Sequence, residues 1–263
     1  MLAEKIRKIE QRLSLLAKET LSPDSRKHSE FVKTGWAEID GILNGGLTPG
    51  LHEWLGLAMS QNETSQRKSN WTPTLSILVH LAWQCLKKSP SSWVVWIGRV
   101  CLPYPATLTR ENGQDQHLLD RSLFVSLSDT ATRLWAMDMT LRSPVVTAVI
   151  ADGSKLDMAA TRRLHLVAKT HRKTIVLARP FWELSELSAA QTRWRAAWKP
   201  SETESPRWSI KLMRCKGVLL EQSQTSWILE LNRETGTLHL SSALADYAGD
   251  ARATENKAAT HSA

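Results

Sequence analysis

The segment from Thr34 to Gly56 reads TGWAEIDGILNGGLTPGLHEWLG and carries the strongest signals for the fold. It holds six of the twelve glycines of the chain, and they lie where turns are needed, on either side of short apolar segments. Apolar residues at helical spacing predict a short helix that ends at Asn44-Gly45-Gly46, a glycine signal for the end of a helix. Pro49-Gly50 predicts a turn and Leu51 to Leu55 a compact strand. The stretch therefore predicts a helix, a turn and a buried strand in quick succession.

Length and composition indicate a globular protein. A chain of 263 residues can bury the core of one large domain, and a hydrophobic content of 42% is typical of globular proteins. No apolar run approaches the roughly 20 residues that a membrane helix needs, and the N-terminus alternates charges with leucines, unlike a signal peptide. We therefore expect a cytoplasmic protein with no membrane partner. The widely separated Cys85, Cys101 and Cys215 are expected to be reduced thiols, and neither a metal site nor a cofactor is expected.

The two ends of the chain are predicted to lie outside the main domain. The first unit is segment 1–20. Its residues 2–20 predict an amphipathic helix, because leucines and isoleucines recur at steps of three and four. This helix either docks on its own domain or binds a partner, for example through self-association of the protein. Residues 21–33 are expected to be a polar linker and 34–244 the main domain. Residues 245–263 are small and polar and are expected to be a disordered tail.

Strands and helices are predicted to alternate through the first part of the main domain. Continuous apolar runs predict strands at 93–97 and 145–151, a further buried strand is predicted at 174–178, and another short strand at 123–127. Helical patterns precede or separate them, at 73–88, 131–141 and 158–171. The first of these helices is expected to start with Thr72 as N-cap and Pro73 at the first helical position. The polar residues from Leu57 to Asn70 are expected to form a loop.

The pattern changes after Pro180. Four segments predict strands with no room for helices between them, at 191–199, 207–214, 226–232 and 237–240. Such strands pair antiparallel at the edge of a sheet. The predicted fold class is therefore α/β, with a three-layer core in which helices flank a mostly parallel sheet, and with antiparallel strands at the C-terminal edge.

The loop after Gly56 lacks a complete phosphate-binding motif. Such a motif, G-x-x-x-x-G-K-S/T, uses glycines to close the backbone around phosphate, a lysine to reach it and a hydroxyl to bind magnesium. Counting from Gly56 places Gln61, Asn62 and Glu63 where Gly, Lys and Thr should stand. The Lys68-Ser69 pair in this loop lacks both glycines, although Lys68 and Ser69 remain candidates for contact with a nucleotide.

Asp152 is a third candidate for the nucleotide site. It follows the apolar residues Ala148 to Ala151, as does the aspartate that holds magnesium in phosphate-loop enzymes. An aspartate that ends a strand is also common as the N-cap of a helix. With no complete phosphate loop, we expect no catalytic residues and weak or absent ATP hydrolysis.

Three blocks together resemble the RecA superfamily over about residues 34 to 220. Thr34 to Gly56 resembles its start, and Val145 to Asp152 its second nucleotide-binding strand. Ile210 to Lys216 resembles a late strand whose two terminal basic residues, matched here by Arg214 and Lys216, face the nucleotide of a neighbouring subunit. RecA-type ATPases end an earlier core strand with a water-activating glutamate, whereas this chain has Gly98-Arg99-Val100 there.

Within that superfamily, the chain most resembles the ImuA family, RecA-like accessory proteins of bacterial mutagenic translesion synthesis. The matching residues are Trp93-Val94-Val95-Trp96-Ile97 with Pro103-Tyr104, Leu134-Trp135-Ala136, Ala178-Arg179-Pro180, Thr192-Arg193-Trp194-Arg195 and Arg214-Cys215-Lys216-Gly217. The resemblance implies a damage-induced adaptor without enzyme activity. It also implies two partners, an inactive Y-family polymerase-like protein and an error-prone replicative-type polymerase.

Basic residues on two late strands are candidates for contact with DNA or phosphate. The net charge is +8, and residues 171–217 hold ten Lys and Arg against four Glu. The candidates are Arg193, Arg195, Lys211, Arg214 and Lys216. Arg193 and Arg195 share one face of a strand, as do Arg214 and Lys216, which suits the backbone of single-stranded DNA. Trp194 is expected on the opposite face, and the alternative interpretation is a solvated edge whose charges prevent aggregation.

Two other functions are compatible with this pattern. One is a SulA-like cell-division inhibitor that binds the tubulin-like division protein, and the other is a DNA-dependent ATPase that uses Lys68 and Asp152. The basic late strands favour the adaptor over the inhibitor, and the missing Gly-Lys pair disfavours the ATPase. The histidines form no cluster suited to a metal or to nucleophilic catalysis and are expected to be structural or exposed; they include His52, His80, His117, His165 and His171.

Overall fold

A computed structural model of the chain describes residues 2–20, 31–56, 71–109, 118–201, 204–218 and 226–241. Lys68 and Ser69, most of the predicted linker and the predicted tail lie outside these ranges, so the expectations for them are not addressed by the structure. No helix in the described ranges is long and apolar enough to cross a membrane.

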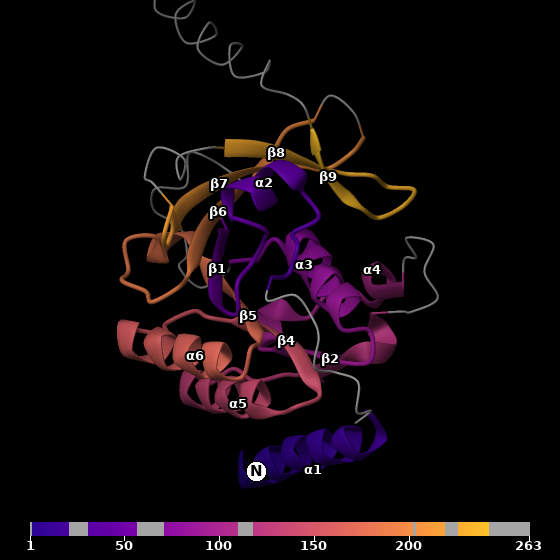
Figure 1. Cartoon of the computed structure of the whole chain (residues 1–263), viewed down its shortest axis with the longest axis vertical. Helices are drawn as coiled ribbons and strands as arrows, with labels where there is room; N and C mark the ends of the chain where they lie inside the picture. Colours follow the sequence, from indigo (N-terminus) through magenta and orange to yellow (C-terminus); the bar gives the residue numbers. More distant parts are fainter. Residues whose placement is uncertain are drawn as a thin grey trace, which may run out of the picture.

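The described strands form one nine-stranded sheet in the order β3-β2-β4-β5-β1-β6-β7-β8-β9 (Figure 1). The first six strands are parallel: β3 (Ser122–Val125), β2 (Trp93–Ile97), β4 (Val146–Asp152), β5 (Thr174–Pro180), β1 (Gly50–Gly56) and β6 (Thr192–Lys199). The last three continue the sheet in antiparallel pairs: β7 (Arg207–Cys215), β8 (Ser226–Leu231) and β9 (Leu238–Ser241). The predicted fold class is confirmed, and β6 is the strand at which the pairing changes from parallel to antiparallel.

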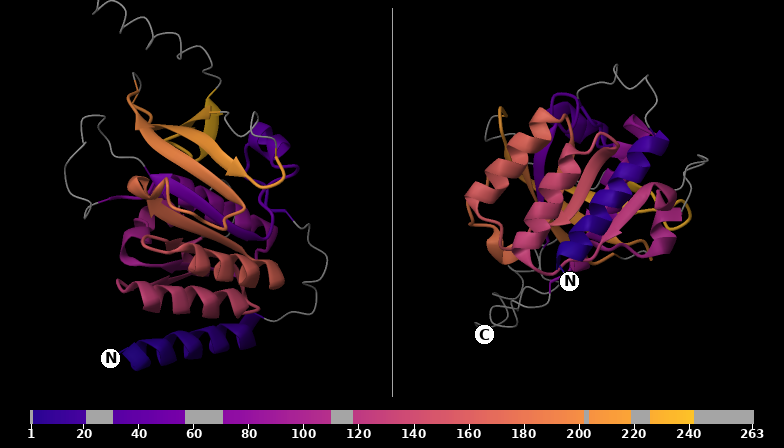
Figure 2. Two further views of the ribbon diagram at one scale, coloured as in Figure 1. Left: turned by 90° about the vertical axis from the view of Figure 1, so that its left-hand side faces the viewer. Right: turned by 90° about the horizontal axis from the view of Figure 1, so that it is seen from below.

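Helices cover both faces of the parallel strands. On one face lie α2 (Ala37–Ile42), α3 (Leu75–Lys88) and α4 (Pro105–Thr109), whose buried residues share a core with Trp54 and Trp96. On the other lie α1 (Leu2–Thr20), α5 (Thr130–Arg142) and α6 (Met158–Thr170), side by side when the molecule is seen from below (Figure 2, right). Short 3-10 turns complete the described elements: η1 (Arg99–Cys101), η2 (Leu119–Arg121) and η3 (Phe181–Glu183).

The stretch that starts at Thr34 folds as its glycines predict. The turn after helix α2 contains Asn44, Gly45 and Gly46, whose φ angles are 54°, 117° and 128°. A side chain on Gly46 would collide with the backbone carbonyl of Val32, so this position requires glycine. Val32 itself pairs with Leu47 and is buried in the core, although the sequence placed it in the linker. The packed core therefore begins before Thr34.

The N-terminal helix α1 docks on its own domain. Leu13 and Leu16 are buried in the same core cluster as Val95 of β2 and Met137 of α5. Of the two alternatives left open by the sequence, the structure shows docking, since the apolar stripe covers apolar surface of the same chain. Self-association through α1 stays a prediction.

Helix α3 begins two residues later than the sequence predicts. Its first residue is Leu75, and Thr74 precedes it without forming a side-chain cap. Pro73 remains outside because its carbonyl accepts a turn hydrogen bond from Leu75 N at 2.8 Å. The expectation of an N-cap at Thr72 was therefore wrong, because the proline takes part in a turn that precedes the helix.

Strands β7, β8 and β9 continue the sheet past the part that α6 covers, and one of their two sides carries no described helix (Figure 2, left). Their other side packs into the core through Trp194, Ile210, Leu212 and Trp227. Sequence alternation along β6 then directs Arg193, Arg195, Ala197 and Lys199 to the opposite side.

His52 is neutral in the folded protein because it is completely buried in β1. Its Nε2 donates to Thr48 O at 2.9 Å, and its Nδ1 lies 2.8 Å from Thr192 Oγ1, which in turn accepts from Trp194 Nε1. Desolvation, opposed by the Thr48 bond and aided by repulsion from His165, lowers the pKa of His52 to about 4. The structural role expected for this histidine agrees with these contacts.

We expect the free energy of unfolding to fall between pH 6.5 and 4 because of His52. In this range the unfolded histidine binds a proton that the folded one does not, which costs on the order of 3 kcal/mol by pH 4. Urea denaturation at several pH values should show a weaker pH dependence for His52→Gln than for the wild type. The same change at exposed His239 is the control, and equal pH dependence of His52→Gln and wild type would contradict the account.

Candidate functional site

The carboxyl ends of parallel strands are where ligands bind in open α/β sheets. In this protein, charged side chains form two buried groups on and beside β4, β5, β1 and β6, one at the carboxyl end of β4 and one at the middle of β1. One group is centred on Asp152 and the other on Glu53, and every charged member of both is at least nine-tenths buried as a residue. Both groups pair carboxylates with arginines of this same chain.

Asp152 forms a buried ion pair with Arg133 of α5. Its Oδ2 lies 2.9 Å from Arg133 Nη1, and its Oδ1 accepts a hydrogen bond from Ser154 N at 2.9 Å. Arg133 also donates to the carbonyl oxygens of Ser128 and Ser154, at 3.0 and 2.7 Å. The arginine is thus held on two sides, and it supplies the positive charge that this carboxylate needs in a buried setting.

This geometry does not fit a magnesium ion. Both carboxylate oxygens of Asp152 already accept bonds, and the guanidinium beside them would repel a divalent cation. Gly98, at the end of β2, has a φ of +102°, and a Cβ there would stand 2.5 Å from Asp152 Cβ and 3.4 Å from Arg133 Cδ. The end of β2 therefore packs directly on the ion pair and leaves no room for a longer side chain.

Glu53 is the centre of the second group. Its side chain is 0% exposed, and its two oxygens bind Arg179 of β5 and Arg193 of β6, at 2.9 and 2.7 Å. Ser188 adds a hydrogen bond of 2.6 Å to the same carboxylate. Arg179 also binds Glu183, at 2.7 Å, so the group holds two carboxylates and two guanidinium groups.

The Glu53 group fixes the connection between β5 and β6. Arg193 donates to the carbonyl oxygens of Leu184 and Glu183, at 3.2 and 3.3 Å, and Ser188 belongs to the same connection. Desolvation opposes the charge of Arg179, but attraction to Glu53 and Glu183 outweighs it, and the pKa of Arg179 is raised. The two carboxylates and the two guanidinium groups bind one another, so removal of one leaves another without its partner.

The structure divides the five predicted phosphate-binding residues. Arg193 is 9% exposed and bound to Glu53, so its side chain is not available for the contact with phosphate that the sequence suggested. Arg214 is directed inward as well, since its Nη2 donates to Ser188 O and Ala190 O at 2.7 and 2.9 Å. Arg195 and Lys216 are exposed and Lys211 is half-buried, although Lys216 Nζ also donates to Ala189 O.

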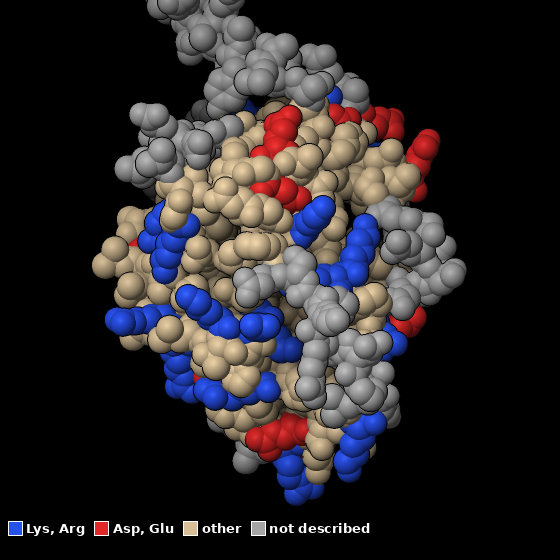
Figure 3. Space-filling view, in the orientation of Figure 1, with Lys and Arg blue, Asp and Glu red and all other residues tan. Residues whose placement is uncertain are grey.

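Basic side chains gather on the side of the molecule where β6, β7 and α6 lie, whereas acidic side chains lie over α2 (Figure 3). The pKa of Lys216 is lowered by partial burial and by repulsion from Arg214 and from Lys169 of α6. Burial and repulsion from Arg193 likewise lower the pKa of Arg214. This clustering of like charges favours binding of an anion.

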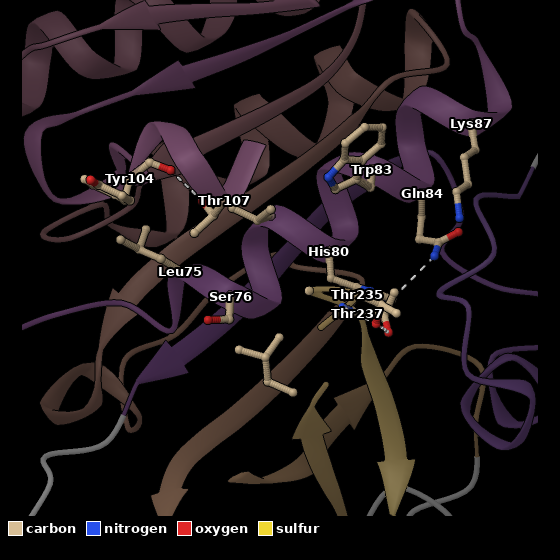
Figure 4. A pocket seen from close by; sticks show the side chains of 13 residues that line it. Leu75, Ser76, His80, Trp83, Gln84, Lys87, Tyr104, Thr107, Thr235 and Thr237 are labelled. Atoms are coloured by element: carbon tan, nitrogen blue, oxygen red, sulfur yellow. Dashed lines mark hydrogen bonds between the residues drawn. The ribbon is translucent and has the colours of Figure 1, made fainter. Parts of the chain in front are cut away.

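A cavity of about 150 Å³ lies on the opposite face of the sheet, between α3, α4 and the β8–β9 turn (Figure 4). Leu75 and Tyr104 lie at one end, and Gln84 and Lys87 at the other, with Trp83 between them. Tyr104 is 73% exposed. The cavity therefore joins an apolar end to a cationic end, which suits a segment that carries an apolar and an acidic group.

Comparison with known proteins agrees with this architecture. In solved structures, the RadB recombinase matches with a TM-score of 0.57 at 13% identity, covering 80% of this chain and 99% of that chain. The fold is RecA-like. Protein ImuA of Caulobacter vibrioides, from strains NA1000 / CB15N and ATCC 19089 / CIP 103742 / CB 15, is 26% identical over 220 residues, covering 73% of this chain and 82% of the relative. No protein-family model matches the chain.

Sequence reasoning missed Arg133, Glu53 and Glu183 as members of the two buried groups. A signal for Glu53 was present, because a glutamate in the middle of an apolar strand needs a partner if the strand is buried. No comparable signal marked Arg133, because the apolar and polar residues of its helix are not clearly separated onto two faces. Within the described residues no group of three or more potential ligands is placed to hold a metal ion.

We expect Glu53→Gln to lower the free energy of unfolding by about 3–5 kcal/mol, because Arg179 and Arg193 would stay buried with their compensating charge removed. Urea denaturation measures the change. Glu186→Gln, at an exposed glutamate of the same β5–β6 connection, is the matched control and should change stability by less than about 0.5 kcal/mol. A loss below about 1 kcal/mol for Glu53→Gln would show that the carboxylate does not compensate both arginines.

Proposed function

We propose that this protein is a RecA-like accessory protein of damage-induced translesion DNA synthesis, which acts by binding partners and not by hydrolysing a nucleotide. The ion pair between Arg133 and Asp152 carries the proposal. Asp152 resembles the magnesium-binding aspartate of phosphate-loop enzymes, but here the guanidinium of Arg133 lies beside it. The sequence adds that the loop after Gly56 has no Gly-Lys-Ser/Thr triplet. The similarity to Protein ImuA supports the biological setting.

The geometry favours this reading over an ATPase that uses Lys68 and Asp152. Such an enzyme would need Asp152 free to bind a metal ion, directly or through water. In the structure both oxygens of Asp152 accept bonds from the chain itself. The Arg133 guanidinium would have to leave a buried position with several hydrogen bonds before a cation could enter.

The purified full-length protein should therefore show no magnesium-dependent ATP hydrolysis above that of buffer, with or without single-stranded DNA. Phosphate release measures this, and Asp152→Asn serves as the control for contaminating activity. Turnover by the wild type that Asp152→Asn abolishes would overturn the non-hydrolytic part of the proposal.

For the partner contact we propose the cavity beside α3. Leu75 and Lys87 lie about 18 Å apart along the helix, at 1.5 Å per residue, which is long enough to hold a short peptide segment. An apolar side chain fits the end at Leu75 and Tyr104, since a cavity of about 150 Å³ accepts one large residue. Lys87 is exposed at the other end and favours a carboxylate. The proposed occupant is an acidic segment with an apolar anchor from a polymerase-like partner.

A pull-down from DNA-damaged cells tests this contact. The tagged wild type should recover a Y-family polymerase-like protein or an error-prone replicative-type polymerase. Ser76→Trp and Lys87→Glu should each reduce the recovery several-fold, because they obstruct the cavity or reverse its charge. Lys18→Glu, at an exposed position of α1, is the charge-matched control. Recovery of the tubulin-like division protein instead would favour the SulA-like alternative, and recovery of neither would contradict the adaptor.

A further inference from the structure

One side of the β6–β7 pair carries a ladder of basic residues. Residues directly opposite each other on antiparallel strands project on the same side. The pairs on the side away from the Trp194 core are Arg193 with Arg214, Arg195 with Lys211, Ala197 with Ser209 and Lys199 with Arg207. Six of these eight residues are therefore Lys or Arg. Lys199 and Arg207 were not identified from the sequence and belong to this ladder.

Three of the six basic residues are already satisfied by the protein. Arg193 binds Glu53, Arg207 binds Glu230 of β8 at 2.9 Å, and Arg214 donates to two backbone carbonyls. The other three, Arg195, Lys199 and Lys211, have no carboxylate partner within the described part of the chain. The protein thus compensates Arg193 and Arg214 at one end of the ladder and Arg207 at the other, and it leaves Arg195, Lys211 and Lys199 open.

Edge protection does not account for these open charges. Lysines on an edge strand prevent unwanted pairing with another chain. However, β6 is paired on both sides, with β1 and β7, and β7 is paired with β6 and β8. Because Arg195 and Lys211 stand directly opposite each other, their repulsion destabilises the strand pair unless an anion binds between them.

The surroundings of the ladder select the kind of anion. Its centre consists of Ala197 and Ser209, which are small and offer no anchor of the kind that dominates protein interfaces. The aromatic Trp194 and Trp198 project on the opposite side by alternation, so no aromatic stacking platform accompanies the open charges. A ligand recognised by charge alone, with anionic groups at regular intervals, fits this side.

We propose that the ladder binds the phosphodiester backbone of a nucleic acid, with Arg195, Lys199 and Lys211 contacting phosphate oxygens without reading bases. Arg193 and Arg214 position the strands and do not contact the ligand. This inference goes beyond the adaptor role proposed above, since neither partner binding nor the absence of hydrolysis requires it. Lys216, which is exposed next to Arg214, extends the same basic surface toward α6.

The test measures binding of the full-length protein to a fluorescein-labelled DNA of about 20 nucleotides, offered as a single strand and as a duplex. Fluorescence anisotropy reports the affinity at salt concentrations from about 50 to 300 mM, a range over which phosphate contacts weaken. The variant with Arg195→Gln, Lys199→Gln and Lys211→Gln should bind at least about tenfold more weakly at low salt. Its log–log salt slope should fall by about 2 on the single strand, at about 0.7 per lost phosphate contact. The relative affinities of the two forms identify which nucleic acid is preferred.

The control removes the same charge elsewhere, with Arg7→Gln, Arg12→Gln and Lys18→Gln at exposed positions of α1. This variant should keep the affinity and slope of the wild type. Equal losses of affinity in the two variants, or no binding by the wild type at about 50 mM salt, would overturn the proposal. It would also be overturned if the wild type bound polyglutamate as tightly as it binds the nucleic acid. The single change Lys199→Gln, expected to reduce the slope by about 0.7, replaces the triple variant if urea denaturation shows that variant to be unfolded. Loss of binding here would leave the ATPase and pull-down results unaffected.

Discussion

The carboxylate of Glu53 is the constraint on which the arrangement of the C-terminal half depends. It lies in the central strand β1 and is completely buried, so its charge has to be balanced inside the protein. Arg179 balances it from β5 and Arg193 from β6, and Arg193 also holds the backbone of the connection between these strands. Since β6 is the strand on which the antiparallel extension is built, the position of the basic ladder is set by an ion pair within the parallel core.

Most of the fold could be predicted from the sequence because the parallel strands are buried on both faces and are therefore continuous apolar runs. The runs at Trp93, Val145 and Thr174 became β2, β4 and β5 almost without change. Short elements without periodicity, such as α4 and the three 3-10 turns, could not be predicted, since their conformation depends on packing. The start of α3 was misplaced for a related reason: a Thr-Pro pair suits a turn and a helix start equally well.

The sites were harder to predict than the fold. Alternation correctly separated Arg193 and Arg195 from Trp194, because it reports the side of a strand on which a residue projects. It does not report whether that side is covered, and the β5–β6 connection covers Arg193 but not Arg195. The end of β4 likewise identified Asp152, whereas its partner Arg133 comes from a different element and is found only from the packing of α5 on β4. Partner identity in a buried ion pair is a property of tertiary structure.

Arg133 has a consequence for how such a protein is controlled. A RecA-like domain that binds and hydrolyses ATP alternates between states that differ in the charge near its strand ends, and its partners can distinguish those states. Arg133 is part of the chain, so this counter-ion of Asp152 cannot dissociate from the protein as a nucleotide or a metal ion can. If hydrolysis is absent as proposed, no cycle of nucleotide binding and hydrolysis switches the domain between states at this position. Its activity would then be set by how much protein the cell makes and how long it persists.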